Sequence, residues 1–219
     1  LAVHLARDLP VRTRIRLVSV GPAGDRWSAV TEEGDVITAA AVLLTPPVPQ
    51  ALELLAAGGT ELASDLGASL GQLDYDRCLT VLAFLDKPAH LPAPGLLEPA
   101  AGPIARLVDE QAKGTSLVPA VTLHGTPDFS RRRWDQETDE WAADLMGAAE
   151  PVLEASVVEH QVHRWKFSRP ASTWPEPCLV AGDRPPLVLA GDAFGGPDVP
   201  GAYRSGLAAA EIVAGLLGP

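Results

Sequence analysis

The chain has 219 residues, of which 47% are hydrophobic and 21% charged, a composition typical of a globular protein with a substantial core. Its formal net charge of −11 argues against nucleic acid and against an anionic membrane surface as partners. No apolar run is long enough to suggest a membrane span. Because Cys78 and Cys178 are far apart in the sequence, we expect two free thiols in a reducing compartment, the cytoplasm.

The N-terminal part of the chain carries patterns for a helix and several strands. Leucines at helical spacing in residues 1–9 predict an amphipathic helix, and alternating residues 11–20 predict a half-buried strand. A turn signal at residues 33–35 predicts a small antiparallel hairpin, and the chain is then expected to form a buried strand at residues 41–45. Since the sequence opens inside a helical pattern, we interpret it as a piece of a longer protein.

The middle of the chain mixes helices and strands. Residues 51–70 are typical of a helix broken at Gly58 and Gly59, and residues 135–153 of an amphipathic helix with Trp141, Leu145 and Val152 on one side. The basic run at residues 131–133 precedes several acidic residues, which predicts ion pairs at a helix start. Strands are predicted at residues 78–86, 116–126 and 157–170.

The C-terminal segment "LVLAGDAFGGPDVPGAYRSGLAAA" is the most informative one. It predicts a buried parallel strand at residues 187–190, then Gly191 and Asp192 at its carboxyl end, where open α/β sheets bind ligands. A glycine-rich turn leads into a helix of small residues, whose amides favour an anionic group. Two interpretations remain open at this point: a ligand contact, or a plain strand, loop and helix capped by an aspartate.

The same segment resembles the C-terminal flavin motif of the FAD-dependent amine oxidase superfamily. "VLLTPPVPQ", "LHGTPDFS" and "HRWKFSRP" further resemble its bacterial renalase-like branch of NAD/FAD-dependent oxidoreductases. The resemblance implies an α/β fold with an α+β insert. Residues 1–49 and 178–219 would be parts of a Rossmann-like FAD/NAD(P)-binding domain that is incomplete at its N-terminus, and residues 50–177 a mixed-sheet substrate domain.

The resemblance also implies roles for individual residues. Asp192 would bind the ribityl or pyrophosphate part of FAD, and the amides of Ala202 and Tyr203 would face the pyrimidine edge of the flavin. The backbone of Val11 would meet the adenine. The implied cofactor-binding residues are Val11, Gly191, Asp192, Val199, Gly201, Ala202 and Tyr203.

Trp165 and Phe167 are two apart on a predicted strand, so they share one face. They are the candidate catalytic-site residues, as walls of a substrate cavity in front of the flavin, although packing in a core is the commoner use of such a pair. His160 and His163, three apart on this strand, point to opposite faces and are not expected to share a metal.

One departure from the family pattern is large, because the sequence contains no G-x-G, whereas the family begins with a G-x-G-x-x-G turn for the FAD pyrophosphate. We expect a missing N-terminal segment in cis or in trans, whose first strand would lie beside residues 187–190. The implied activity is oxidation of a small reduced substrate, a dihydronicotinamide such as NAD(P)H or an amine, by hydride transfer to FAD with O₂ as acceptor. The alternative is a non-catalytic binding remnant of such a flavoprotein.

Overall fold

The computed structural model describes residues 2–218, which form two units. Unit 1 combines the two ends of the chain, Leu1–Asp74 and Pro170–Pro219, and unit 2 is the central part, Tyr75–Arg169. The units are described separately below. The predicted domains change at residues 49/50 and 177/178, whereas the two units change at residues 74/75 and 169/170; the predicted substrate domain includes the helices that follow Pro47. These helices belong to unit 1.

A small antiparallel sheet in unit 1 confirms the antiparallel hairpin predicted around residues 33–35. It consists of β1 (Leu17–Ala23), β2 (Arg26–Thr31) and β3 (Val36–Ala39) in that order. The turn between β2 and β3 contains Gly34, whose φ of +88° favours glycine. The predicted strand begins only at Leu17, so Val11 lies in coil with 57% of its side chain exposed. The prediction of a strand from residue 11 is therefore wrong, because residues 11–16 join no ladder.

The second sheet of unit 1 contains the C-terminal strand. Its members are β4 (Val42–Leu44), β10 (Leu179–Asp183) and β11 (Pro186–Leu189), in the order β10-β11-β4. The β4–β11 pair is parallel, and β10–β11 is an antiparallel hairpin. The strand β11 has a neighbouring strand on each side, β10 and β4, so the prediction that a missing strand would lie beside residues 187–190 is wrong. In the parallel pair, β4 is the strand at the edge of the sheet.

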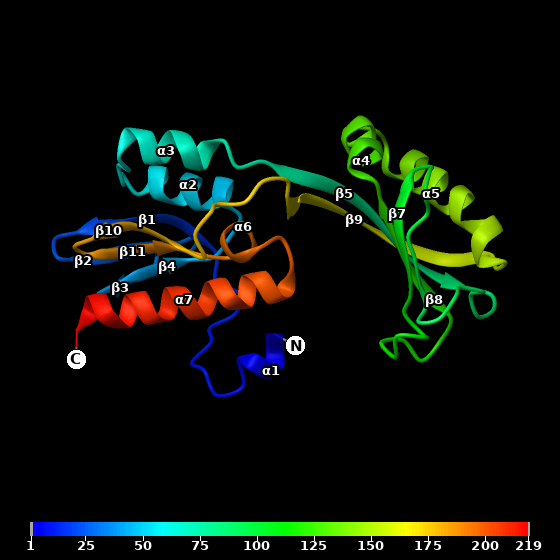
Figure 1. Cartoon of the computed structure of the whole chain (residues 1–219), viewed down its shortest axis with the longest axis horizontal. Helices are drawn as coiled ribbons and strands as arrows, with labels where there is room; N and C mark the ends of the chain where they lie inside the picture. Colours follow the sequence, from blue (N-terminus) through cyan, green and yellow to red (C-terminus); the bar gives the residue numbers. More distant parts are fainter. Residues whose placement is uncertain (1, 219) are drawn as a thin grey trace. The chain divides into compact units, whose positions relative to one another are not determined.

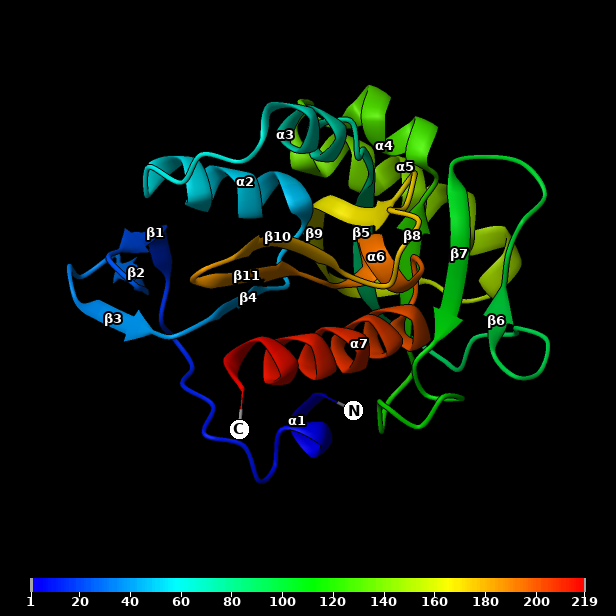
Figure 2. The ribbon, with the colours of Figure 1, turned by 60° about the vertical axis from the view of Figure 1, so that its left-hand side comes forward.

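Helices lie on both sides of this sheet (Figures 1 and 2). On one side are α2 (Val48–Ala57) and α3 (Ser64–Gly71), which confirm a helical region broken at Gly58 and Gly59. A Cβ at Gly58 would lie 2.2 Å from the Val20 carbonyl oxygen, so the glycine lets the end of α2 contact β1. The short helix α1 (Ala2–Leu5) and the long α7 (Val199–Leu217) lie on the other side, and α6 (Asp192–Gly195) follows β11.

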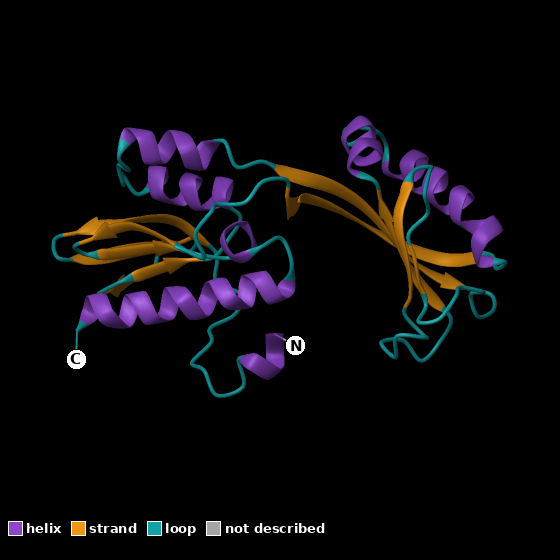
Figure 3. Cartoon of the chain, viewed as in Figure 1, coloured by secondary structure: helices purple, strands orange, loops and turns teal. Residues whose placement is uncertain are grey.

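Unit 2 is a five-stranded sheet with its helices on one face (Figure 3). The order is β6-β7-β8-β5-β9. The elements are β5 (Tyr75–Leu85), β6 (Leu96–Leu97), β7 (Ile104–Asp109), β8 (Ala120–Gly125), β9 (Val157–Pro170), α4 (Pro127–Arg133) and α5 (Thr138–Leu153). Trp141 and Leu145 of α5 are fully buried against Leu79 and Val81 of β5, so alternate residues of β5 form the core.

The structure corrects two details of the sequence analysis in unit 2. Val152 is 37% exposed, whereas Leu153 is fully buried, so the core face of α5 runs through Trp141, Leu145 and Leu153. The arginines do form ion pairs, but they end α4 and do not begin α5: Arg131 lies 3.0 Å from Asp128. Within residues 2–218, no helix has the length and hydrophobicity needed to cross a membrane.

Candidate functional site

The carboxyl ends of the parallel strands β4 and β11 meet in unit 1. A Cβ added at Gly191 would lie 3.3 Å from the Thr45 carbonyl oxygen, and the φ of Gly191 is +130°, so this position needs glycine. The Gly191 amide donates to the Ser205 hydroxyl at 2.8 Å, and Ser205 is fully buried in α7. The strand end is thereby fixed to the helix, at the edge of the sheet where α/β folds bind ligands.

Asp192 is the ionisable group at this strand end. Its side chain is partly buried, and burial raises its pKa, partly offset by the backbone amides of Ala193 and Asp192 itself. Within the described residues, no other side chain hydrogen-bonds its carboxyl group. A carboxylate with unused acceptor capacity in a partly desolvated position is suited to binding hydroxyl groups of a ligand.

The beginning of α7 is closed by internal hydrogen bonds. Asp198 is the N-cap: its side chain accepts from the Gly201 amide at 2.6 Å, and its carbonyl accepts from the Ala202 amide at 2.9 Å. A Cβ at Gly201 would lie 2.3 Å from the Gly196 carbonyl oxygen. The Ala202 amide thus has an acceptor within the helix, and its use by a flavin stays a prediction; the glycine at 201 is explained by packing against the loop.

The other predicted cofactor residues stay predictions, and the structure gives their environments. Val199 and Tyr203 carry side chains that are 62% and 53% exposed at the start of α7. Unit 1 thus brings together Gly191, Asp192, Val199, Gly201, Ala202 and Tyr203, with Val11 in the coil before β1.

Trp165 and Phe167 lie on β9 of unit 2, as predicted, but in different environments. Trp165 is 49% exposed and contacts the ring of His163, with 4.1 Å between ring centroids and an angle of 55° between the ring planes. Phe167 packs edge-on against the buried Tyr75 at 5.5 Å. Packing therefore accounts for Phe167, whereas an exposed indole is an unusual surface residue that a ligand could cover.

A polar cluster on β5 and β8 was not anticipated. The Nδ1 atom of His124 lies 3.4 Å from the Thr80 hydroxyl and 3.8 Å from the Cys78 sulfur. Burial, and next the positive charge of Arg106, lower the pKa of His124, so its imidazole is neutral at neutral pH. Burial raises the pKa of the Cys78 thiol, which opposes thiolate chemistry. His124 lies opposite Thr80 because of the register between β5 and β8, which the sequence alone does not give.

An adjoining cavity of about 380 Å³ lies on the face of the sheet away from the helices. Leu82 and Phe84 line it, and both are more than 40% exposed. Glu110 is at its rim: burial opposes ionisation of this group, but hydrogen bonds from Thr115, Thr122 and Lys113 outweigh it and lower the pKa. The face therefore combines apolar walls, a carboxylate and a neutral histidine.

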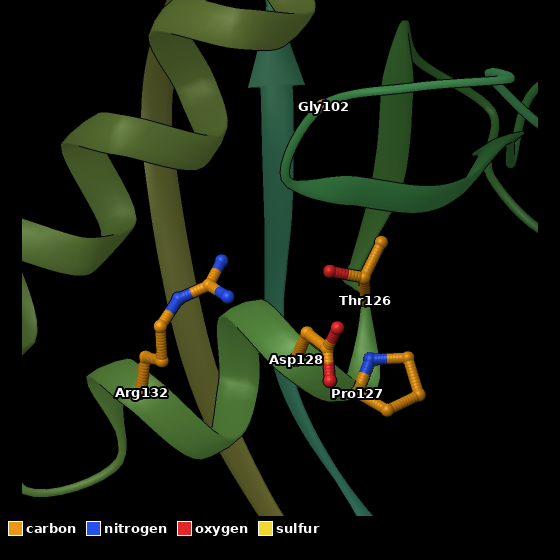
Figure 4. A pocket seen from close by; sticks show the side chains of 5 residues that line it. All are labelled: Gly102, Thr126, Pro127, Asp128 and Arg132. Carbon is orange, nitrogen blue, oxygen red and sulfur yellow. The ribbon is translucent and has the colours of Figure 1, made fainter.

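A second hollow lies at the start of α4 and is lined by Gly102, Thr126, Pro127, Asp128 and Arg132 (Figure 4). The Thr126 hydroxyl is already used as the N-cap of α4, accepting from the Phe129 amide, and Asp128 is paired with Arg131. These polar groups thus have partners within the protein. Across residues 2–218, no three His, Cys, Asp or Glu side chains gather as metal ligands would.

Comparison with known proteins identifies the family of the chain. The family "Flavin containing amine oxidoreductase" matches residues 1–214, nearly the whole chain. The chain belongs to this family. Membership implies FAD as the cofactor. Comparison with curated proteins finds no match.

Three solved structures of related fold are distant in sequence. A putative protoporphyrinogen oxidase from Exiguobacterium sp. is 20% identical over 91% of this chain, with a TM-score of 0.64. Putrescine oxidase bound to putrescine is 14% identical over 96% of this chain, with a TM-score of 0.67. A fatty acid isomerase from P. acnes is 12% identical over 94%, with a TM-score of 0.64. At these identities the likeness shows the fold.

The chain spans about half the length of these proteins: the alignments cover 47% of the Exiguobacterium protein, 51% of putrescine oxidase and 50% of the isomerase. The residues of unit 1 fit part of FAD. Asp192 provides an acceptor suited to a polyol, and the Gly191 turn leaves no side chain in the way. A glycine turn for the pyrophosphate is not found in the sequence.

Proposed function

We propose that the chain is the C-terminal portion of a flavin-dependent oxidoreductase of the renalase-like branch, acting in the cytoplasm. The observation that carries the proposal is the partly buried Asp192 carboxyl group, without another side-chain partner in the described chain, at the carboxyl end of a parallel strand in a protein of this family. The desolvation of such a group is a cost that a bound polyol would offset.

The proposed reaction is the two-electron oxidation of a small reduced substrate, either a dihydronicotinamide such as NAD(P)H or an amine. The substrate loses a hydride to the flavin, and O₂ is the final acceptor. FAD supplies the electron-accepting ring when bound, so this chain needs no acid and base of its own. The role of Asp192 is to accept hydrogen bonds from the ribityl hydroxyls and so to orient the cofactor.

Trp165 is the residue we assign to the substrate cavity. Its indole is half exposed on β9 and is already held in place by the His163 ring, so a planar or apolar substrate could cover it without a change of rotamer. Phe167 supports the strand through its contact with Tyr75. We therefore expect Trp165→Ala to raise KM more than Phe167→Ala does at equal protein stability.

We further propose that other polypeptide, in cis or in trans, supplies the phosphate-binding turn. The net charge of −11 disfavours binding of the negatively charged FAD pyrophosphate unless backbone amides or cations from other polypeptide surround it. Neither nucleic acid nor a membrane has a part in the proposed function.

The test is flavin binding by the protein purified from its native cells. We expect flavin near one equivalent per chain and an Asp192→Asn variant whose FAD affinity falls about 10- to 100-fold, the loss expected for a hydrogen bond to a charged group. Asp183→Asn is the matched control, because Asp183 is an exposed aspartate in the β10–β11 hairpin of the same unit. A folded, colourless native protein, or equal losses in the two variants, would overturn the proposal.

The second candidate is a non-catalytic binding remnant, favoured by the absence of any G-x-G in the sequence. The two candidates differ in one property: a remnant retains a folded unit 2 and binds its partner or ligand there without flavin. Native protein that is folded, bound to a partner and free of flavin would favour the remnant.

A further inference from the structure

Three consecutive arginines end α4 in unit 2, and they differ in their partners. Arg131 pairs with Asp128 at 3.0 Å. Arg133 pairs with Asp144 of α5 at 2.8 Å. Arg132 is exposed and has no hydrogen bond, ion pair or ring contact within the described chain. Because a guanidinium group carries five N–H donors and is always charged, Arg132 keeps its full capacity to bind an anion.

The unpaired guanidinium borders a hollow between α4 and α5. This hollow, called the junction hollow below, has a volume of about 500 Å³ and is lined by Phe129, Arg132, Arg133 and Gln136. No carboxylate of the described chain is among its lining residues. The hollow in Figure 4, which Arg132 also lines, differs because the Asp128 carboxylate lies beside it. An anion therefore fits the junction hollow better.

The walls of the junction hollow are held in place by other side chains. The Oε1 atom of Gln136 accepts from Arg133 at 2.7 Å, and its backbone carbonyl accepts from Arg164 of β9 at 2.7 Å. The guanidinium of Arg77 lies over the ring of Trp134, 4.8 Å from its centroid. The segment between the two helices is thus fixed before a ligand arrives, which reduces the entropy that binding would cost.

The position relative to α5 also favours an anion. Gln136 directly precedes Glu137, the N-cap of this helix of 16 residues, and the Glu137 side chain makes no capping hydrogen bond. The N-terminal end of a helix attracts negative charge. Asp139 and Glu140 in the first turn already use part of this attraction. The affinity for an anion is therefore expected to be modest.

A simpler explanation for the arginines is that basic residues in the last turn of α4 complement its dipole. That explanation treats the three arginines alike. The structure does not: Arg132 alone of the three lacks a carboxylate within the described chain, and Arg131 does not line the junction hollow. The two explanations consequently predict different results for the three positions.

We infer that the junction hollow is a binding site for a small organic anion, whose carboxylate or phosphate group is held by Arg132 and, to a smaller extent, by Arg133. The planar fork of a guanidinium group matches both kinds of anion through two parallel hydrogen bonds. A volume of about 500 Å³ is in the range of small-molecule sites. In a chain of net charge −11, a hollow lined by two cations is an exception that a bound anion explains.

This anion site is separate from the substrate cavity proposed at Trp165. Arg164 lies over the ring of Trp141 in α5, 5.5 Å from its centroid, so it points to the helix side of the sheet. Successive residues of a strand point to opposite faces, and Trp165 therefore points to the other face. The inference does not depend on flavin, and its test can be read whether or not the protein contains flavin.

The test is isothermal titration calorimetry of the protein purified from its native cells, with succinate and inorganic phosphate as separate probes. We expect saturable binding of at least one probe, one per chain, with a Kd on the order of 1 mM, as a few charge-assisted hydrogen bonds at an exposed site provide. The probe that binds more tightly identifies the ligand as a carboxylate or a phosphate. Absence of saturable binding by both probes would overturn the inference.

Substitution of the three arginines, one at a time, locates the site. Each change to glutamine removes one positive charge from the same end of α4, so the general effect of charge is equal. Arg132→Gln should weaken binding about tenfold or more. Arg133→Gln should weaken it less, because Asp144 shares this guanidinium, and Arg131→Gln should leave it unchanged. Equal losses in the three variants, or a loss in Arg132→Gln alone, would contradict binding in the junction hollow.

Two further measurements protect the test against a change of fold. Without a probe, Arg132→Gln should unfold at the same temperature as the unaltered protein, because Arg132 is exposed and unpaired in the described chain. Hydrogen exchange of the unaltered protein should slow in peptides of residues 129–137 when the tighter-binding probe is added. Slower exchange only in other peptides would place the ligand elsewhere and overturn the inference.

Discussion

The two units of this protein differ in how far they complete their own cores. In unit 2, α5 buries Trp141 and Leu145 on the sheet and carries acidic residues such as Asp139 and Glu140 on its exposed side. In unit 1, α7 buries only small residues and exposes large apolar ones, such as Tyr203 and Leu207. The difference teaches that α5 uses its large apolar residues to form a core, whereas α7 packs through small residues and leaves its large ones exposed.

The largest effect should come from the core of unit 2. Leu145→Ala removes a fully buried side chain between α5 and the sheet and should lower the free energy of unfolding by about 2–5 kcal/mol. Hydrogen exchange followed by mass spectrometry reports each unit separately, and the loss should be confined to peptides of residues 75–169. A loss of similar size in unit 1 would show that the units do not fold independently.

The next effect should come from the turn before α7. Gly201→Ala places a Cβ 2.3 Å from the Gly196 carbonyl oxygen, so backbone must shift, at a cost of about 1–3 kcal/mol. The control is Gly206→Ala, one and a half turns further along α7, where an added Cβ contacts nothing within 4 Å. That variant should gain about 0.5–1 kcal/mol from the better helix propensity of alanine. Chemical denaturation of both variants checks the opposite signs.

A smaller effect with a distinctive pH dependence is expected at Asp192. Burial raises its folded-state pKa, so above that pKa the ionised group destabilises unit 1, and the penalty disappears below the ordinary aspartate value of about 3.9. Asp192→Asn should therefore be more stable than the unaltered protein at neutral pH, and the difference should shrink as the pH falls. A difference that grows towards acid pH in denaturation experiments would mean that the carboxylate is stabilised, not desolvated.

The smallest effect is expected on the outer face of α7. Leu207→Gln in the isolated chain should change the free energy of unfolding by less than about 0.5 kcal/mol, because the leucine is 51% exposed there. A loss well above 1 kcal/mol in the isolated chain would show that the face is already covered and would remove the contrast between the units.

Much of the secondary structure was readable from the sequence. The alternation in β5, the length of β9 and the turn at Gly34 each gave the correct element, because these signals are local. The strands β7 and β10 were not predicted, and Val11 was wrongly placed in a strand. Short strands depend on a neighbour for their hydrogen bonds, and the sequence does not state which neighbours are present.

In the candidate site, too, local features were predicted correctly and features that depend on distant segments were not. The segment from β11 to α7 was found from its apolar strand, glycine turn and small-residue helix. The bond from the Ala202 amide to the Asp198 carbonyl was not predicted, although the Asp198–Val199–Pro200 pattern is itself typical of a capped helix start. His124 was missed because only the pairing of β8 with β5 places it beside Thr80 and Cys78.

The sequence by itself determined the family, the strand–turn–helix that ends the chain and the carboxylate at its centre, because these features lie within a few tens of contiguous residues. The tertiary structure decided that β11 is flanked by β10 and β4, that Asp198 closes the start of α7, and that Leu43 and Tyr203 are exposed. These properties depend on contacts between segments far apart in the chain, which local pattern does not encode.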